Sequence, residues 1–146
     1  MIKDIRHTGI VVKDIEKSLR FYRDFLGLKV FSEDKEKGSF IEKLVGIDDV
    51  ELKWVKLKTP DGNLVELIEY ISHPYNITSL NDSSANKTGC PHLAFTVDDI
   101  EKFYDAYKSM GYRSINPPAL SLNGKVKVMY CFDPDEVILE FVEEIK

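Results

Sequence analysis

A short motif occurs twice in this chain, at a constant offset of 85 residues. The first copy runs from His7 to Lys17 and the second from His92 to Lys102, and both contain a His, a Val and the run Asp-Ile-Glu-Lys. A fixed-period repeat is the sequence signature of a fold built from similar units. Chance similarity between two generic strand–helix segments is the alternative, but it would rarely repeat the same ionisable residues in the same order. We therefore predict an internal duplication.

A second match supports the duplication and shows that the copies differ in length. Residues 60–69 match residues 134–143 at an offset of 74, and the Pro, the Asp and both Glu coincide. Because this offset is smaller than the first, the first copy must contain an additional loop or short helix. We expect that surplus between Glu33 and Asp49, where charges and two glycines interrupt the hydrophobic pattern.

Each copy has the hydrophobic pattern of one strand, one helix and three further strands. Asp14 and Asp99 stand where helix N-caps are expected, and Gly27 and Gly111 stand where the helices should end. The charged run 33–37 is expected to be a solvated loop. The predicted elements are, in order, strand 5–12, helix 15–26, strands 30–33, 50–58 and 64–71, then strand 91–97, helix 99–110, a weak strand 113–115 and strands 124–132 and 136–143.

This pattern predicts an α+β fold made of two tandem βαβββ modules whose sheets curl around a shared cavity. Module one covers residues 1–71, a linker rich in Ser, Asn and Thr covers 72–89, and module two covers 90–146. Together the modules form one domain, 1–146, which fits the length of a single ordinary domain.

Composition excludes several classes of function. A net charge of −5 without a basic block does not fit a nucleic-acid binder, and no apolar run is long enough to cross a membrane. The two cysteines, Cys90 and Cys131, are too few for a secreted disulfide framework. With no secretory signal pattern at the N-terminus, we expect a cytoplasmic protein that acts on a small molecule.

Four ionisable residues occupy equivalent strand positions in the two copies: His7, Glu66, His92 and Glu140. A carboxylate in the middle of a strand between aliphatic residues is costly to bury unless it is paired or bound to a cation. Imidazole and carboxylate together suit one divalent metal ion, namely Zn, Ni, Co or Mn. Ion pairs with Lys56, Lys58 or Lys127 are the alternative for the glutamates. The duplication of the whole set favours a metal site with positions left open for adjacent substrate oxygens.

The hairpin turns at Asp61 and Asp135 predict which residues face the two glutamates. Pairing the strands about these turns puts Lys56 opposite Glu66 and Tyr130 opposite Glu140. Lys56 is thus a candidate to bind a substrate anion, and Tyr130 is a candidate hydrogen-bond donor. A surface lysine and a core aromatic residue are equally compatible with the pattern.

With these residues in place, the sequence resembles the vicinal oxygen chelate superfamily of glyoxalases, bleomycin-resistance proteins and dioxygenases. The resemblance implies a metal-dependent lyase or isomerase, similar to glyoxalase I, that moves a proton through an enolate with Glu66 and Glu140 as catalytic groups. It also implies a homodimer. A similar acyl-thioester epimerase, like methylmalonyl-CoA epimerase, is an alternative. A dioxygenase or resistance enzyme, or a metal-free binding module of the same fold, is another.

Some positions depart from the patterns of these relatives. The epimerase commonly has Gln where this chain has Glu66, and dioxygenases and fosfomycin-resistance enzymes use two His and one Glu. Bacterial glyoxalase I has an Arg and an Asn for glutathione where this chain has Val11 and Tyr70. Glu136 stands where the family usually has Gly in the final turn. The substitutions at 11 and 70 argue against glutathione as the cosubstrate.

Overall fold

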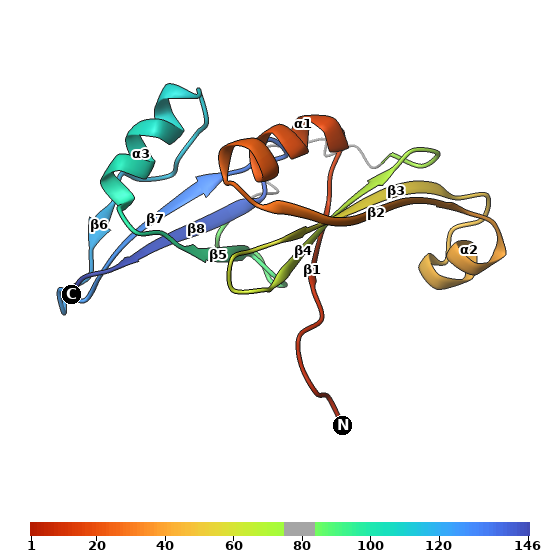
Figure 1. The fold of residues 1–146 in the computed structure, drawn as a ribbon, viewed down its shortest axis with the longest axis horizontal. Coiled ribbons are helices and arrows are strands. Elements are labelled where there is room, and N and C mark those ends of the chain that lie inside the picture. The colour runs from red at the N-terminus through yellow and green to blue at the C-terminus, as the bar shows by residue number, and fades with distance from the viewer. Residues whose placement is uncertain (75–83) are drawn as a thin grey trace. The chain divides into compact units, whose positions relative to one another are not determined.

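The computed structural model describes residues 1–74 and 84–146 and divides the chain into two compact units, Met1–Asn76 and Ile77–Lys146 (Figure 1). Part of the predicted linker, residues 75–83, lies outside the described residues. No helix among the residues described is long and apolar enough to cross a membrane.

Unit 1 contains a four-stranded sheet with the strand order β1-β4-β3-β2 (Figure 1). Strand β1 runs parallel to β4, and the other neighbouring strands are antiparallel. Its elements are β1 (Thr8–Val11), α1 (Ile15–Leu19), the π-helical turn η1 (Arg20–Phe25), β2 (Lys29–Lys37), α2 (Ser39–Val45), β3 (Glu51–Lys58) and β4 (Leu64–Tyr70).

Unit 2 repeats this topology with the strand order β5-β8-β7-β6. Strand β5 is parallel to β8, as β1 is to β4. Its elements are β5 (His92–Thr96), α3 (Ile100–Ser109), β6 (Ala119–Leu120), β7 (Val126–Phe132) and β8 (Ile138–Glu144). The predicted α+β fold with two βαβββ modules is therefore confirmed in its strand and helix order.

Helices α1 and α3 begin directly after the two aspartates that were predicted to cap them. The side chain of Asp14 accepts a hydrogen bond from the backbone N–H of Lys17, and that of Asp99 accepts one from the backbone N–H of Lys102. Both hydrogen bonds are 3.0 Å long. Such caps satisfy backbone donors that the first helical turn leaves without a partner. Gly27 ends the first helical segment with a φ of 77°, a conformation that glycine adopts without strain.

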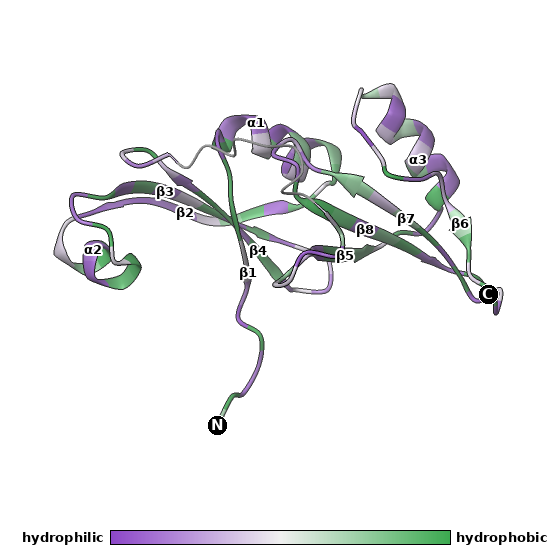
Figure 2. Cartoon of the chain, turned by 180° about the vertical axis from the view of Figure 1, so that it is seen from behind, coloured by the Kyte–Doolittle hydropathy of each residue, from purple (hydrophilic) through white to green (hydrophobic). Residues whose placement is uncertain are grey.

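Two predicted elements were wrong, and the first strand is shorter than predicted, Thr8–Val11 instead of 5–12. The charged run 33–37 is not a loop but the second half of β2, whose residues pair with β3 as far as Lys37 opposite Glu51. Because β2 is an edge strand, most of its residues can remain exposed while its backbone pairs with β3. Figure 2 shows hydrophilic colouring along this strand. In unit 2 the short strand between the helix and β7 is β6 rather than 113–115, where Ser114 forms an isolated bridge with Cys131.

The apolar residues of each unit gather between sheet and helix. In unit 1, Phe21 and Tyr22 are fully buried from the helical side, and in unit 2 Tyr107 is fully buried against Phe141 of β8. A smaller cluster lies under α2, which is the short helix expected from the longer first copy. That cluster consists of Ile41, Val50 and Leu52, with Val45, Ile47, Trp54, Ile68 and Tyr70 packed against it.

Candidate functional site

In unit 1 the predicted residues His7 and Glu66 are in contact. Glu66 lies in the middle of β4 opposite Gly9 of β1, and His7 immediately precedes β1. Nε2 of His7 is 2.9 Å from Oε2 of Glu66. The carboxylate side chain is only 11% exposed, so it needs the polar partners that surround it.

Unit 2 brings together the equivalent pair. Glu140 of β8 lies opposite Ala94 of β5, the strand that begins at His92. Nε2 of His92 is 3.1 Å from Oε2 of Glu140. The same topology therefore produces the same imidazole–carboxylate contact in each unit.

The donor atoms of each pair suit a divalent metal ion. Two neighbouring ligands on one octahedral ion are about 3 Å apart, because metal–nitrogen and metal–oxygen bonds are about 2.1 Å long. The separations within both pairs agree with this value, and they are equally those of the direct hydrogen bonds that the pairs form without a metal. Over the described parts of the chain, neither unit gathers three or more His, Cys, Asp or Glu side chains into one cluster, so each unit supplies two candidate ligands.

The second ring nitrogen of His7 has a less usual environment. Metal-bound histidines commonly donate this N–H to a carboxylate, a carbonyl or water. Nδ1 of His7 is buried and has no hydrogen-bond partner among the residues that the structure describes. The pair in unit 1 thus has the donor set of a metal site without the usual protein acceptor behind the histidine.

Lys56 contacts the other oxygen of Glu66. The two residues are directly opposite each other on β3 and β4, as the hairpin predicts, and Nζ of Lys56 is 3.3 Å from Oε1 of Glu66. Of the other lysines considered as partners, Lys58 lies over the ring of Phe31 and Lys127 pairs with Glu101. Glu66 is therefore held between an imidazole and an ammonium group.

Tyr130 occupies in unit 2 the register position that Lys56 has in unit 1. It lies opposite Glu140, as predicted, and its ring centroid is 5.2 Å from that of His92. Burial, and then the negative charge of Glu140, raise the pKa of the Tyr130 hydroxyl. The hydroxyl is therefore a neutral hydrogen-bond donor over the whole physiological pH range.

Two residues beside Lys56 were not predicted to take part in the site. The ring centroid of Trp54 lies 4.3 Å from Nζ of Lys56. The Nε1–H of Trp54 donates a hydrogen bond of 2.6 Å to Oε1 of Glu36. Strand alternation places Trp54 on the same face as Lys56, which was the available signal. Glu36 could not be found in this way because it lies in the run that was predicted to be a loop.

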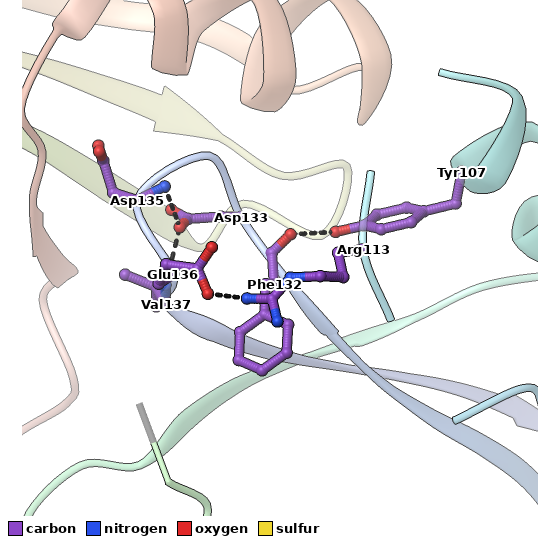
Figure 3. A network of polar contacts seen from close by, with 7 residues as sticks. All are labelled: Tyr107, Arg113, Phe132, Asp133, Asp135, Glu136 and Val137. Atoms are coloured by element: carbon purple, nitrogen blue, oxygen red, sulfur yellow. Dashed lines mark hydrogen bonds and ion pairs between the residues drawn. The ribbon is translucent and has the colours of Figure 1, made fainter. Parts of the chain in front are cut away.

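The turn before Glu140 is fixed by a polar network (Figure 3). The buried carboxylate of Asp133 accepts hydrogen bonds from the backbone N–H groups of Asp135 and Val137, each over 2.8 Å. Tyr107 donates its hydroxyl to the carbonyl of Phe132 over 2.6 Å. These contacts set the start of β8 and hence the register of Glu140 with Tyr130.

The two positions that serve glutathione in bacterial glyoxalase I have apolar or packed side chains here. Val11 is 54% exposed at the end of β1. Tyr70, at the end of β4, packs against the cluster under α2. Neither residue repeats the Arg or the Asn expected for glutathione.

Comparisons with known proteins place this chain in a family. The model of the Glyoxalase/Bleomycin resistance protein/Dioxygenase superfamily matches residues 4–141. The protein YwkD of Bacillus subtilis is 30% identical over 99% of both chains, and a probable lactoylglutathione lyase of Synechocystis is 27% identical over 94% of this chain and 92% of its own. A glyoxalase family protein from Bacillus cereus, 18% identical, has the same fold with a TM-score of 0.89 over 100% of this chain and 97% of its own. The chain belongs to the Glyoxalase/Bleomycin resistance protein/Dioxygenase superfamily.

Proposed function

We propose that this protein is a metal-dependent lyase or isomerase, similar to glyoxalase I, that moves a proton next to a substrate carbonyl. The observation that carries the proposal is the duplicated His–Glu contact, at 2.9 Å in unit 1 and 3.1 Å in unit 2. Relatives named lactoylglutathione lyase cover most of the chain and support the same type of reaction.

In this proposal the His7–Glu66 pair and the His92–Glu140 pair each supply one imidazole and one carboxylate as ligands for a divalent metal ion, at one ion per chain. The ion would chelate two adjacent substrate oxygens and stabilise the negative charge of an enolate. Two carboxylates and two neutral imidazoles would balance the charge of a divalent ion, which leaves no electrostatic barrier against an anionic substrate.

The two glutamates differ in their surroundings, and this favours Glu140 as the group that moves the proton. Glu66 contacts both His7 and Lys56, which hold its two oxygens. Among the described residues, the ionic contact of Glu140 is with His92 alone. A carboxylate held from one side is freer to leave its partner and to take a proton from carbon. Tyr130, opposite Glu140, would donate a hydrogen bond to the substrate.

An acyl-thioester epimerase is the second candidate. Val11 provides no charge for glutathione, and Tyr70 is engaged in the cluster under α2. A coenzyme A thioester involves no glutathione, yet its carbon acid needs the same metal-assisted proton transfer. In this chain the epimerase would use the same ligands and the same proton carrier, with Glu66 where the epimerase commonly has Gln.

Elemental analysis of the untagged protein tests the proposal. We expect about one equivalent of Zn, Ni, Co or Mn per chain, and weaker retention of the metal in Glu140→Gln. The matched control is Glu144→Gln, which removes the same charge from an exposed position of the same strand and should keep the metal.

The reaction is then followed in deuterated water with a 2-oxoaldehyde–thiol adduct and with a chiral acyl thioester. Deuterium should enter at the carbon that loses its proton, and Glu140→Gln should abolish this exchange. A protein that retains no metal, and whose melting temperature no added metal raises, would contradict the proposal.

A further inference from the structure

Three neighbouring strands of unit 1 fix an ammonium group beside Glu66. Lys56 on β3 contacts Glu66 on β4 at 3.3 Å, and its Nζ also lies 4.3 Å from the ring centroid of Trp54. The indole of Trp54 is in turn held by the carboxylate of Glu36 on β2. We refer to Glu36, Trp54 and Lys56 as the ammonium clamp.

The clamp restrains a side chain that is otherwise flexible. Immobilising a lysine costs up to about 2 kcal/mol of side-chain entropy, so a free lysine loses that much when it binds an anion. In this protein the contacts with the ring of Trp54 and the carboxylate of Glu66 already restrain the lysine, so this entropy is lost before a ligand binds. Such pre-organisation increases affinity.

The ammonium of Lys56 still has capacity to bind. It has three N–H donors, and within the described residues its polar contact is Glu66, while the ring of Trp54 covers a second side. The side chain is 22% exposed, so the remaining donor can reach a ligand. The lysine is therefore more than a neutralising partner of the glutamate.

The charges around the clamp favour an anion once a metal ion shares the carboxylate of Glu66. Lys56 and Glu66 cancel each other as long as the carboxylate belongs to the ion pair alone. A divalent ion on His7 and Glu66 would share that carboxylate and leave the ammonium uncompensated. In unit 2 the same register position is the neutral Tyr130, so this cation is a feature of the first copy.

We infer that the ammonium clamp binds a carboxylate of the substrate, and that the substrate is a small carboxylic acid with an oxygen on the adjacent carbon. The inference rests on the proposed function, because the proposed metal site defines where the reacting oxygens lie. Since Lys56 touches a proposed metal ligand directly, the carboxylate must be next to the reacting carbon. A carboxylate at the end of a long thiol substituent would not meet this condition.

Binding of oxamate and oxamide tests the inference. Both probes are small and have adjacent oxygens, but oxamate has one negative charge and oxamide has none. Titration calorimetry should show tighter binding of oxamate than of oxamide, with a larger preference in the zinc-loaded protein than in the metal-free protein, where Glu66 compensates Lys56. The fluorescence of Trp54, the single tryptophan of the chain, should change on addition of oxamate because an anion then binds the ammonium that contacts its ring.

Substitutions should change oxamate binding in opposite directions. Lys56→Gln should weaken oxamate about tenfold or more, the usual loss for a hydrogen bond to a charged group, and leave oxamide unchanged. Glu36→Gln keeps an acceptor for the indole but removes a negative charge, so it should tighten oxamate binding. Lys58→Gln is the matched control, because it removes the same charge two residues along β3 and should have little effect.

Three outcomes would overturn the inference. They are equal losses for oxamate and oxamide in Lys56→Gln, a similar loss in Lys58→Gln, or no preference for oxamate over oxamide in either form. If the protein binds no zinc, the proposed metal function fails, yet the metal-free titration still decides whether Lys56 selects the carboxylate.

Discussion

Glu143 on β8 accepts a hydrogen bond from the backbone N–H of Ile100, the first residue of α3, over 2.9 Å. Glu69 on β4 does the same for Ile15, the first residue of α1, over 3.0 Å. These glutamates belong to the same duplicated motif as Glu66 and Glu140, but strand alternation puts them on the opposite face of the sheet. One glutamate of each motif is thus available to the site, and the other ties a helix to the sheet.

We predict that Glu143→Ala lowers the free energy of unfolding by about 1 kcal/mol, the usual cost of losing a helix N-terminal acceptor. Glu143→Gln retains an acceptor oxygen and should lose less. Urea unfolding followed by circular dichroism measures both. Glu144→Ala, at the exposed neighbouring position, should change stability by less than about 0.5 kcal/mol. Equal losses at 143 and 144 would show that the contact with Ile100 contributes nothing.

Much of this fold could be predicted because local signals agreed with one another. The caps at Asp14 and Asp99 and the hairpin turns fixed where helices and strands begin. A two-residue period then placed Lys56 opposite Glu66 and Tyr130 opposite Glu140 without any knowledge of the fold. Because the turn sets the register of a hairpin, two short turn sequences were enough to predict which residues lie opposite Glu66 and Glu140.

The features that were missed depend on contacts with neighbouring strands, which the local sequence pattern does not reveal. Residues 33–37 have the composition of a loop, and they form a strand because β3 offers them a full row of backbone partners. That edge strand carries Glu36, so its contact with Trp54 could not be predicted either. The separation of 2.9 Å between His7 and Glu66 likewise depends on the pairing of β1 with β4, which are far apart in sequence.

Ser18 gives a second prediction about stability. Its side chain is fully buried in α1, and its hydroxyl has no hydrogen-bond partner among the described residues. A buried donor without an acceptor costs about 1–3 kcal/mol. Ser18→Ala removes the hydroxyl and should therefore leave the protein equally stable or stabilise it by about 1 kcal/mol, as measured by thermal unfolding.

Ser109→Ala in α3 is the control for that experiment. The hydroxyl of Ser109 donates to the carbonyl of Ala106 over 2.8 Å, so its removal deletes a contact that exists. We expect no stabilisation from this variant. A loss of stability in Ser18→Ala would mean that its hydroxyl is satisfied in solution.

The backbone conformation of Glu136, in the turn after β7, predicts how substitutions at this position change stability. Glu136 has a φ of 70°, and the equivalent residue of the first copy is Gly62, with a φ of 96°. This region costs a residue with a side chain about 1 kcal/mol, but Asn tolerates it better than a β-branched residue does. Glu136→Asn should thus be more stable than Glu136→Val by about 1 kcal/mol in urea unfolding. Both variants lose the ion pair with Arg113, so the difference isolates the backbone.

The two cysteines should differ strongly in reactivity. Cys90 is exposed and Cys131 is buried in β7. Burial raises the pKa of the Cys131 thiol from 9.0 to about 12. Because the thiolate is the reactive species, a thiol reagent at pH 8 should modify Cys90 rapidly and Cys131 only after unfolding. Mass spectrometry of the native and the urea-treated protein counts the labels, and a Cys90→Ser variant that still reacts rapidly would contradict the prediction.

The same raised pKa makes stability depend on alkaline pH. Above pH 9 the unfolded chain loses the Cys131 proton while the folded chain keeps it, so the folded state binds more protons. The stability that this group contributes is complete below pH 9 and is lost as the pH rises toward 12, by about 1.4 kcal/mol per pH unit. Urea unfolding between pH 8.5 and about 11 should thus show a shallower decline in Cys131→Val than in the parent protein. Parallel declines in the two proteins would show that Cys131 titrates alike in the folded and unfolded states.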